Sequence, residues 1–255
     1  MPSEIVVVSE CSMRAGLLPT YAKQLREAGI DFTLREGASQ YLTTGIGNGG
    51  DLRHKIEHVL FYAKLLKQHR YIVFTDAWDV LFYGTHAEVL EKLMKRDNGG
   101  LVMAAERGCW PDYYLGPHFP GTTPWRFVNG GLMAGTPQRL VEWVAWVKAH
   151  PAYLGEMIDQ QWMGHRYLQG ERVNVVLDER TELFHCVHGD HGELGFEDGK
   201  PVNLLCDTHP NFLHFCGGID PMKYQLLAAM SKMKAAAAAT TAKGGVYASS
   251  TGRVD

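Results

Sequence analysis

YIVFTDAWD, residues Tyr71–Asp79, is an apolar run that ends at two aspartates three positions apart. Short runs rich in β-branched and aromatic residues are typical of buried strands. A strand that ends in aspartates is one way in which an α/β protein holds a divalent cation at the carboxyl edge of its sheet. Residues three apart on a strand point to opposite faces, so one ion can meet both carboxylates only if the chain turns after Thr75. We predict that turn at Ala77-Trp78, with oxygen ligands that favour Mg²⁺ or Mn²⁺ over zinc. The alternative is a loop cap at Asp76 and a surface residue at Asp79.

The segments on both sides of this stretch alternate between strand and helix patterns. Ile5–Ser9 and Asp31–Leu34 have strand patterns around a helix at Leu18–Ala28, which indicates an opening βαβ unit and a parallel sheet. Residues 52–68 carry apolar side chains at helical spacing behind Asp51, a plausible N-cap. The pattern continues with strands at Leu101–Ala105, Val173–Leu177 and Asn211–Phe215, an apolar segment at Asn129–Ala134, and helices around Leu90 and Leu93, at Gln138–His150 and at Glu156–Tyr167. This alternation predicts an α/β fold.

Length and composition predict one domain with a tail. The chain has 255 residues, of which 45% are hydrophobic, and no Pro/Ser-rich linker interrupts residues 1–230. Residues 231–255 form an Ala-rich helix end and a Thr/Gly/Ser-rich stretch that has nothing to bury, so we predict a disordered tail there. The Gly/Pro/aromatic loop Glu106–Arg126 has the length at which loops are usually functional or mobile.

Charge and cysteine content exclude several classes of protein. With 25 basic and 28 acidic residues, the chain has no global electrostatic drive toward nucleic acid or anionic membranes. The first residues lack a secretory pattern and no run reaches about 20 apolar residues, so we expect a soluble, cytoplasmic protein without a membrane partner. Five cysteines without a CxxC pair indicate reduced thiols rather than a disulfide framework or structural zinc. We interpret His185–His191 as a polar hairpin turn, not a zinc site.

Five segments outside the strand pattern carry side chains or backbone suited to a ligand site. The Gly-rich run Gly45–Gly50 lets backbone N–H groups approach an anion ahead of a helix, although it matches neither a Walker loop nor a dinucleotide fingerprint. A loop tryptophan can stack on a base or sugar, and an asparagine beside glycines can hydrogen-bond sugar hydroxyls. The other segments are Cys109–Asp112, Phe127–Gly131, Asp159–Gln161 and Phe212–Gly218. Taken alone, each of these five segments is more often a packing, turn or helix-face feature than a ligand site.

In this order the motifs resemble the glycosyltransferase domain of multifunctional procollagen lysyl hydroxylases, a metal-dependent nucleotide-sugar transferase of the GT-A fold. The resemblance covers about residues 40–225, and it implies a mixed, mainly parallel sheet flanked by helices. The matching pieces are Phe74–Val80, Ala105–Pro111, Arg126–Gly131, Asp159-Gln160, Asn174–Asp178, and Asp207–Pro210 leading to His214.

The resemblance also implies roles for individual residues. Asp76, Asp79 and His214 are expected to bind Mn²⁺, with Mg²⁺ as a second possibility, and the ion is expected to bridge the diphosphate of a UDP-sugar. Asp159 and Gln160 are the expected catalytic residues. The nucleotide-sugar site is expected to comprise Gly45, Gly47, Lys55, Trp110, Asn129, Gly131, Gly217 and Lys223. The implied reaction moves glucose or galactose to a hydroxyl-bearing acceptor, either collagen-type hydroxylysine or galactosyl-hydroxylysine, or a hydroxymethylated base in DNA.

Two features depart from the family pattern. The family's acidic run is reduced to Asp159 with Glu156 nearby, and Phe215-Cys216-Gly217 follows His214 where the family has Gly-Asn-Gly. The alternatives are a non-catalytic nucleotide-sugar-binding module, in which the catalytic carboxylates have been lost, and a metal-dependent phosphohydrolase or nucleotidyltransferase. The phosphohydrolase or nucleotidyltransferase alternative is disfavoured, because the sequence has neither a Gly-Lys-Ser/Thr loop nor a second carboxylate cluster. The sequence does not indicate an oligomeric state.

Overall fold

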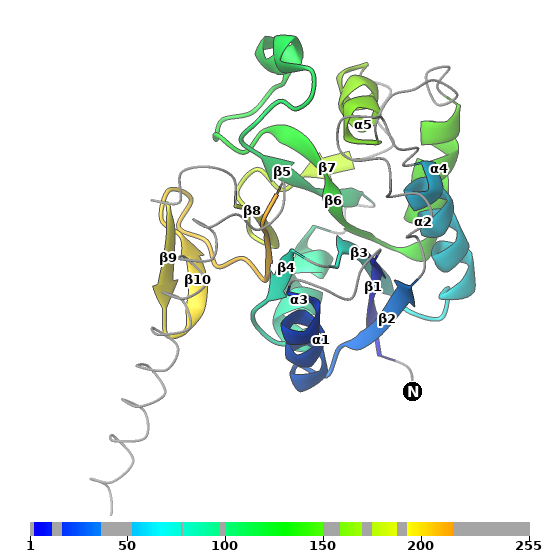
Figure 1. Ribbon diagram of the computed structural model, residues 1–255, viewed down its shortest axis with the longest axis vertical. Coiled ribbons are helices and arrows are strands. Elements are labelled where there is room, and N and C mark those ends of the chain that lie inside the picture. Colours follow the sequence, from blue (N-terminus) through cyan, green and yellow to red (C-terminus); the bar gives the residue numbers. More distant parts are fainter. Residues whose placement is uncertain are drawn as a thin grey trace, which may run out of the picture.

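A mixed six-stranded sheet forms the centre of the molecule in the computed structural model (Figure 1). The described residues are 3–11, 17–36, 53–77, 79–96, 100–149, 159–169, 175–187 and 193–216. The strand order is β2-β1-β3-β6-β5-β7, and only β6 runs antiparallel to its neighbours. The strands are β1 (Ile5–Cys11), β2 (Asp31–Glu36), β3 (Tyr71–Asp76), β5 (Leu101–Glu106), β6 (Phe127–Gly135) and β7 (Val175–Leu177). The predicted mainly parallel α/β architecture is therefore confirmed.

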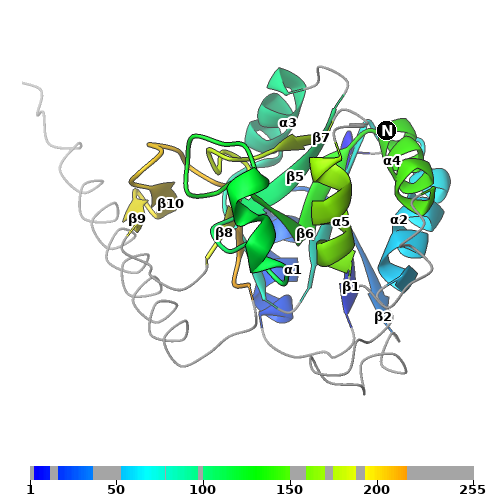
Figure 2. The same cartoon turned by 90° about the horizontal axis from the view of Figure 1, so that it is seen from above.

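Helices cover both faces of this sheet, as the view in Figure 2 shows. On one face lie α2 (Arg53–Leu65), α4 (Pro137–Lys148) and α5 (Asp159–Leu168), and on the other lie α1 (Leu18–Glu27) and α3 (His86–Lys95). Alternate residues of β1 enter the two hydrophobic clusters, Val6 and Val8 on the first face and Ile5 and Val7 on the second. A strand buried on both faces has an unbroken apolar sequence, which explains the runs seen in β1 and β3.

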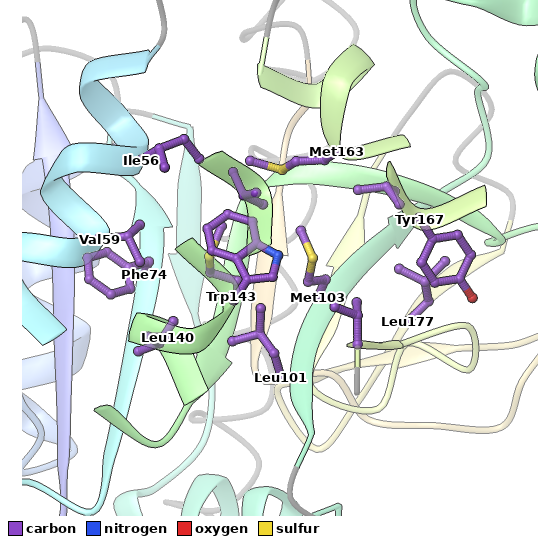
Figure 3. Packing of buried hydrophobic residues seen from close by; sticks show 14 of the residues in the cluster. Ile56, Val59, Phe74, Leu101, Met103, Leu140, Trp143, Met163, Tyr167 and Leu177 are labelled. Carbon is purple, nitrogen blue, oxygen red and sulfur yellow. The ribbon is translucent and has the colours of Figure 1, made fainter. Parts of the chain in front are cut away.

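The larger cluster packs α2, α4 and α5 against the sheet (Figure 3). Trp143 of α4 is 1% exposed and lies among residues of the sheet and of the neighbouring helices. Helix α3, on the opposite face, begins with a capping box in which Thr85 and Glu88 each bind the other's backbone N–H. The apolar contacts pack α2, α4 and α5 against the sheet, and the capping box stabilises the start of α3.

A smaller three-stranded sheet brings the end of the described chain next to β3. It consists of β4 (Val80–Phe82), β11 (Phe212–His214) and β8 (Phe184–Cys186), with β11 in the middle. In the antiparallel β11–β4 pair, His214 lies opposite Val80, the residue after Asp79. The Phe215 N–H also donates to the Asp79 carbonyl at 2.9 Å. This register places an imidazole beside the aspartates that follow β3.

Several details differ from the expectations drawn from the sequence. His185 and Cys186 lie in the buried strand β8, so the predicted polar hairpin turn is wrong for these two residues. β8 pairs with β11, and both side chains are buried. The sequence did not indicate this strand, because the residues around it are polar. The sequence analysis also missed β4, β9 (Leu194–Glu197) and β10 (Lys200–Asn203), because short strands carry little periodic signal.

Other expectations concern parts of the chain outside the described residues. These are the Gly-rich run Gly45–Gly50, the N-cap Asp51, the turn residue Trp78, and the tail at 231–255. Within the described ranges, no helix is long and apolar enough to cross a membrane.

Candidate active site

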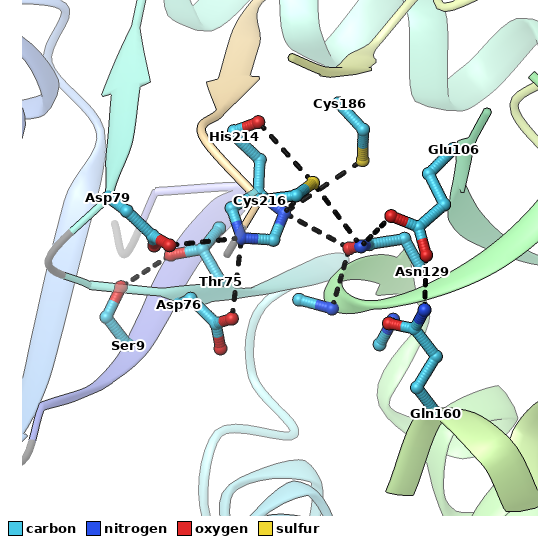
Figure 4. A network of polar contacts seen from close by, with 12 residues as sticks. Ser9, Thr75, Asp76, Asp79, Glu106, Asn129, Gln160, Cys186, His214 and Cys216 are labelled. Carbon is cyan, nitrogen blue, oxygen red and sulfur yellow. Dashed lines mark hydrogen bonds and ion pairs between the residues drawn. The ribbon is translucent and has the colours of Figure 1, made fainter. Parts of the chain in front are cut away.

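Two carboxylates and one imidazole meet at the carboxyl edge of the central sheet. Asp76 is the last residue of β3, Asp79 precedes β4, and His214 ends β11. The His214 Nε2 atom lies 3.5 Å from Asp76 Oδ2 and 3.5 Å from Asp79 Oδ2 (Figure 4). Because β3 ends at Asp76 and β4 begins at Val80, the intervening bend lets both carboxylates face the same ring.

The three side chains fit a hard divalent cation. One ligand atom from each lies within 4.8 Å of the others. Adjacent ligands of an octahedral ion bound at about 2.1 Å are about 3 Å apart, so small adjustments would bring these atoms into coordination. Asp79 Oδ1 is buried and has no hydrogen-bond partner among the residues that the structure describes. A buried, unpaired carboxylate oxygen is costly unless a cation satisfies it.

Gly131 of β6 provides the space for this arrangement. A Cβ atom at Gly131 would lie 2.8 Å from His214 Nδ1 and 2.9 Å from Asp76 Oδ2, and it would approach the His214 Cε1 atom even more closely. Only a residue without a side chain therefore allows the imidazole and the Asp76 carboxylate to lie over β6.

Positive charge balances the two carboxylates. Lys55 of α2 donates to Asp76 Oδ1 at 2.8 Å. Burial raises the pKa of Asp76, although Lys55 and His214 oppose the shift. Burial disfavours charge on His214, but Cys216 and Asp79 outweigh it and raise the pKa of His214 well above its usual value. The Lys55 ammonium thus supplies positive charge of the kind that a divalent cation would supply to the same carboxylates.

A hydrogen-bonded network connects α5 to the back of His214. The Asn129 amide nitrogen donates to Glu106 Oε2 at 3.3 Å, and its oxygen accepts from the Gly131 N–H at 2.9 Å and lies 3.1 Å from His214 Nδ1. Gln160 donates to the other Glu106 oxygen and accepts from the Gly130 N–H at 3.2 Å (Figure 4). Asn129 is only 3% exposed, so its amide serves protein contacts and orients the imidazole.

Glu106 is the member of this network that the sequence analysis did not single out. Burial, reinforced by Cys216, raises its pKa to about 8. Its position follows the same pattern as Asp76, since an apolar strand ends on a carboxylate and β5 runs parallel to β3. That repeated pattern is the signal by which the sequence could have indicated Glu106.

A hollow of about 370 Å³, which includes the solvent at its mouth, lies beside the carboxylates. Its lining includes Lys55, His58, Tyr62, Thr75, Gly130 and Gly131. Two of the residues predicted for the nucleotide-sugar site, Lys55 and Gly131, therefore face this hollow. Lys55 thus places a cation beside the metal-binding edge, which suits a phosphate group.

The structure brings some of the predicted site residues together. Trp110 is 42% exposed, and its carbonyl accepts from the Gln160 amide at 3.3 Å. Asp159 begins α5, but its side chain is outside the description. Gly45, Gly47, Gly217 and Lys223 also lie outside the described residues.

Comparisons with known proteins identify the family of the chain. Residues 35–235 match the family model described as "PLOD GT domain". The chain is 28% identical over 189 residues to the human multifunctional procollagen lysine hydroxylase and glycosyltransferase LH3, covering 71% of this chain and 24% of LH3. It is 31% identical over 216 residues to procollagen-lysine,2-oxoglutarate 5-dioxygenase 1 of Pongo abelii, covering 81% and 27% of the two chains.

A viral protein is a further relative. Uncharacterized protein R699 of Acanthamoeba polyphaga mimivirus is 26% identical over 188 residues, covering 69% of this chain and 39% of R699. The chain thus spans between 24% and 39% of these curated relatives.

The solved structures share the fold. A glycosyltransferase involved in the glycosylation of the major capsid of PBCV-1 superposes with a TM-score of 0.55 at 12% identity, covering 89% of this chain and 98% of that one. The bifunctional glycosyltransferase WbbM gives a TM-score of 0.51 at 13% identity, covering 87% and 47%.

Proposed function

We propose a reaction for this chain from one premise: the chain belongs to the PLOD GT domain family. It is a glycosyltransferase of that type. The proposed reaction is the Mn²⁺-dependent transfer of a hexose, glucose or galactose, from a UDP-sugar to an acceptor hydroxyl. The observation that carries the proposal is the convergence of Asp76, Asp79 and His214 beside the hollow that Lys55 and Gly131 line.

The chemistry of the transfer explains why such a site is needed. Cleavage of a glycosyl–phosphate bond leaves negative charge on the diphosphate and positive charge on the anomeric carbon. A bound Mn²⁺ would supply Lewis acidity toward the leaving diphosphate. Asp76, Asp79 and His214 would hold that ion, and the absence of a side chain at Gly131 lets them converge. Lys55, held at 2.8 Å from Asp76, adds positive charge on the same side.

The start of α5 provides the groups proposed to act on the acceptor. Gln160 is fixed by Glu106 of β5 and by the Gly130 N–H of β6, so the first turn of α5 is tied to the two strands that follow β3 in the sheet order. Asp159 precedes Gln160 on that turn, and we assign it the orientation or deprotonation of the acceptor hydroxyl. We assign Trp110, Gly45, Gly47, Gly217 and Lys223 to contacts with the nucleotide sugar.

The acceptor that we propose is collagen-type hydroxylysine or galactosyl-hydroxylysine. The support is the naming of the relatives, of which LH3 is called a procollagen lysine hydroxylase and glycosyltransferase. The formal net charge of −3 provides no general attraction to a DNA acceptor. Hydroxymethylated DNA is therefore the comparison substrate in the test below.

The test measures UDP release by the purified chain with Mn²⁺ and either UDP-glucose or UDP-galactose. Each donor is tried alone, with a hydroxylysine peptide, with a galactosyl-hydroxylysine peptide, and with hydroxymethylated DNA, and the products are identified by mass spectrometry. We expect release that rises with a peptide acceptor and stops on chelation.

Three other outcomes would overturn the proposal in distinct ways. UDP binding without turnover would indicate a binding module, and release of inorganic phosphate without sugar transfer would indicate a phosphohydrolase. Transfer to DNA alone would change the acceptor while leaving the donor chemistry intact.

A further inference from the structure

The rear nitrogen of His214 faces two thiols. Nε2 points to Asp76 and Asp79, whereas Nδ1 lies 3.5 Å from Cys216 Sγ and 3.9 Å from Cys186 Sγ (Figure 4). One ligand atom from each of Cys186, His214 and Cys216 lies within 4.8 Å of the others. The imidazole thus separates a cluster of hard oxygen ligands from a cluster of soft sulfur ligands.

Two of the three residues of this thiol cluster belong to the small sheet. His214 and Cys186 are direct partners in the parallel β11–β8 pair, and Cys216 follows His214 by two residues. Cys186 is fully buried, and Cys216 is 7% exposed. Two buried thiols at set positions around one ring nitrogen are preorganised, so little conformational entropy is lost when they bind a common ligand.

The spacing of the donor atoms matches a zinc-type site. Zinc binds cysteine sulfur at about 2.3 Å and histidine nitrogen at about 2.0 Å, so tetrahedral geometry places these donors about 3.5 Å apart. The distances from His214 Nδ1 are 3.5 Å to one sulfur and 3.9 Å to the other. Asn129 Oδ1, which accepts from the Gly131 N–H, lies 3.1 Å from the same nitrogen.

We propose that Cys186, Cys216 and the Nδ1 atom of His214 form a second metal site, which takes a soft divalent ion such as Zn²⁺ or Cd²⁺. Binding releases the two thiol protons and forms two metal–sulfur bonds and one metal–nitrogen bond, with no oxidation or reduction. The site is distinct in chemistry from the carboxylate site but shares its histidine.

Sharing the ring makes the two sites antagonistic. When Nδ1 coordinates a soft ion, the neutral imidazole keeps its proton on Nε2. Nε2 then has no lone pair to offer to an ion held by Asp76 and Asp79. We expect Zn²⁺ to weaken Mn²⁺ binding at least about tenfold, the scale on which support of metal ligands acts. This antagonism rests on the proposed function, whereas the existence of the thiol site does not.

Cobalt provides the direct test, because Co²⁺ bound to thiolate has an intense near-ultraviolet charge-transfer absorption. The full chain, kept reduced with a phosphine, is titrated with Co²⁺ in the absence of any nucleotide sugar. We expect the band to appear in the wild type, to disappear on addition of Zn²⁺, and to be absent from Cys186→Ser and Cys216→Ser. The matched control is Cys206→Ser, which removes another buried thiol and should keep the band.

Two results would overturn the inference. One is a wild-type protein without the band, and the other is a band that survives in the Cys186→Ser/Cys216→Ser double variant. If the serine variants do not fold, alkylation of the wild type decides, because Zn²⁺ must slow modification of Cys216 but not of Cys206, which is similarly exposed. Equal rates of alkylation with and without Zn²⁺ would rule out the thiol site. An active transferase without the band refutes only this inference, and a band without transferase activity refutes only the proposed function.

Discussion

Replacing Gly131 with alanine should weaken metal binding while leaving the sheet assembled. The new Cβ would lie 2.9 Å from Asp76 Oδ2 and would overlap the His214 ring, with Nδ1 at 2.8 Å and Cε1 nearer still. Unbonded carbon atoms normally lie about 3.5 Å or more apart, so the ring must retreat by about 1 Å. Retreat is restricted, because His214 is only 4% exposed and the thiol of Cys216 lies behind it.

The size of the effect follows from the tolerance of a metal site. Ligand distances must hold within about 0.2 Å, so a displacement of about 1 Å removes His214 from the coordination sphere. We expect Mn²⁺ affinity to fall about 100-fold, the upper end of the range for disturbed support of metal ligands. A 100-fold loss corresponds to about 3 kcal/mol of binding free energy. Overpacking should cost about 1–3 kcal/mol of folding stability, which leaves the protein folded if its stability is typical.

The assay is Mn²⁺ titration followed by the electron paramagnetic resonance of the free ion, with circular dichroism to confirm folding. The matched control is Gly164→Ala on α5, where a Cβ would lie 3.5 Å from Phe119 Cζ, an ordinary contact. This variant should bind Mn²⁺ like the wild type. If a folded Gly131→Ala protein binds Mn²⁺ as tightly as the wild type, His214 is not a ligand and the reasoning fails.

Three further predictions concern Glu106, Asp79 and the buried Asp178. Because the pKa of Glu106 is raised from 4.5 to about 8, the folded chain keeps a proton that the unfolded chain loses, so stability should fall as pH rises across that window. The free energy of unfolding should fall by at most about 5 kcal/mol over this range. The measurement is the urea midpoint of the wild type and of Glu106→Gln at several pH values, and the difference between the two midpoints should change with pH. A difference that stays constant with pH would contradict this prediction. Asp79→Asn should abolish Mn²⁺ binding and UDP release, and equal UDP release by wild type with and without a chelator would argue against a metal role. Asp178→Ala should cost about 3–5 kcal/mol in denaturant unfolding, because it leaves three backbone N–H donors without an acceptor and leaves Arg96 with Glu182 as its acidic partner, whereas Asp178→Asn should cost less.

The α/β architecture could be predicted from local pattern alone. A parallel sheet covered on both faces needs strands that are apolar throughout, and Tyr71–Thr75 and Leu101–Ala105 meet this requirement within a few residues. Helices α1 and α4 were predictable for a similar reason, since one apolar face recurs at helical spacing. Strand β8 was not, because its burial comes from pairing with a segment distant in sequence.

The sequence by itself determined the covered sheet and the placement of carboxylates where its strands end, because both depend on the order of residues over a few positions. The family resemblance led us to expect Asp76, Asp79 and His214 at one ion, but only the tertiary structure decided which other distant groups share that space. The register of β11 sets His214 between the carboxylates and the thiols, Gly131 leaves room for its ring, and Glu106 and Asn129 hold it from behind. Such contacts depend on strand pairing and side-chain packing across the whole fold, which no local pattern encodes.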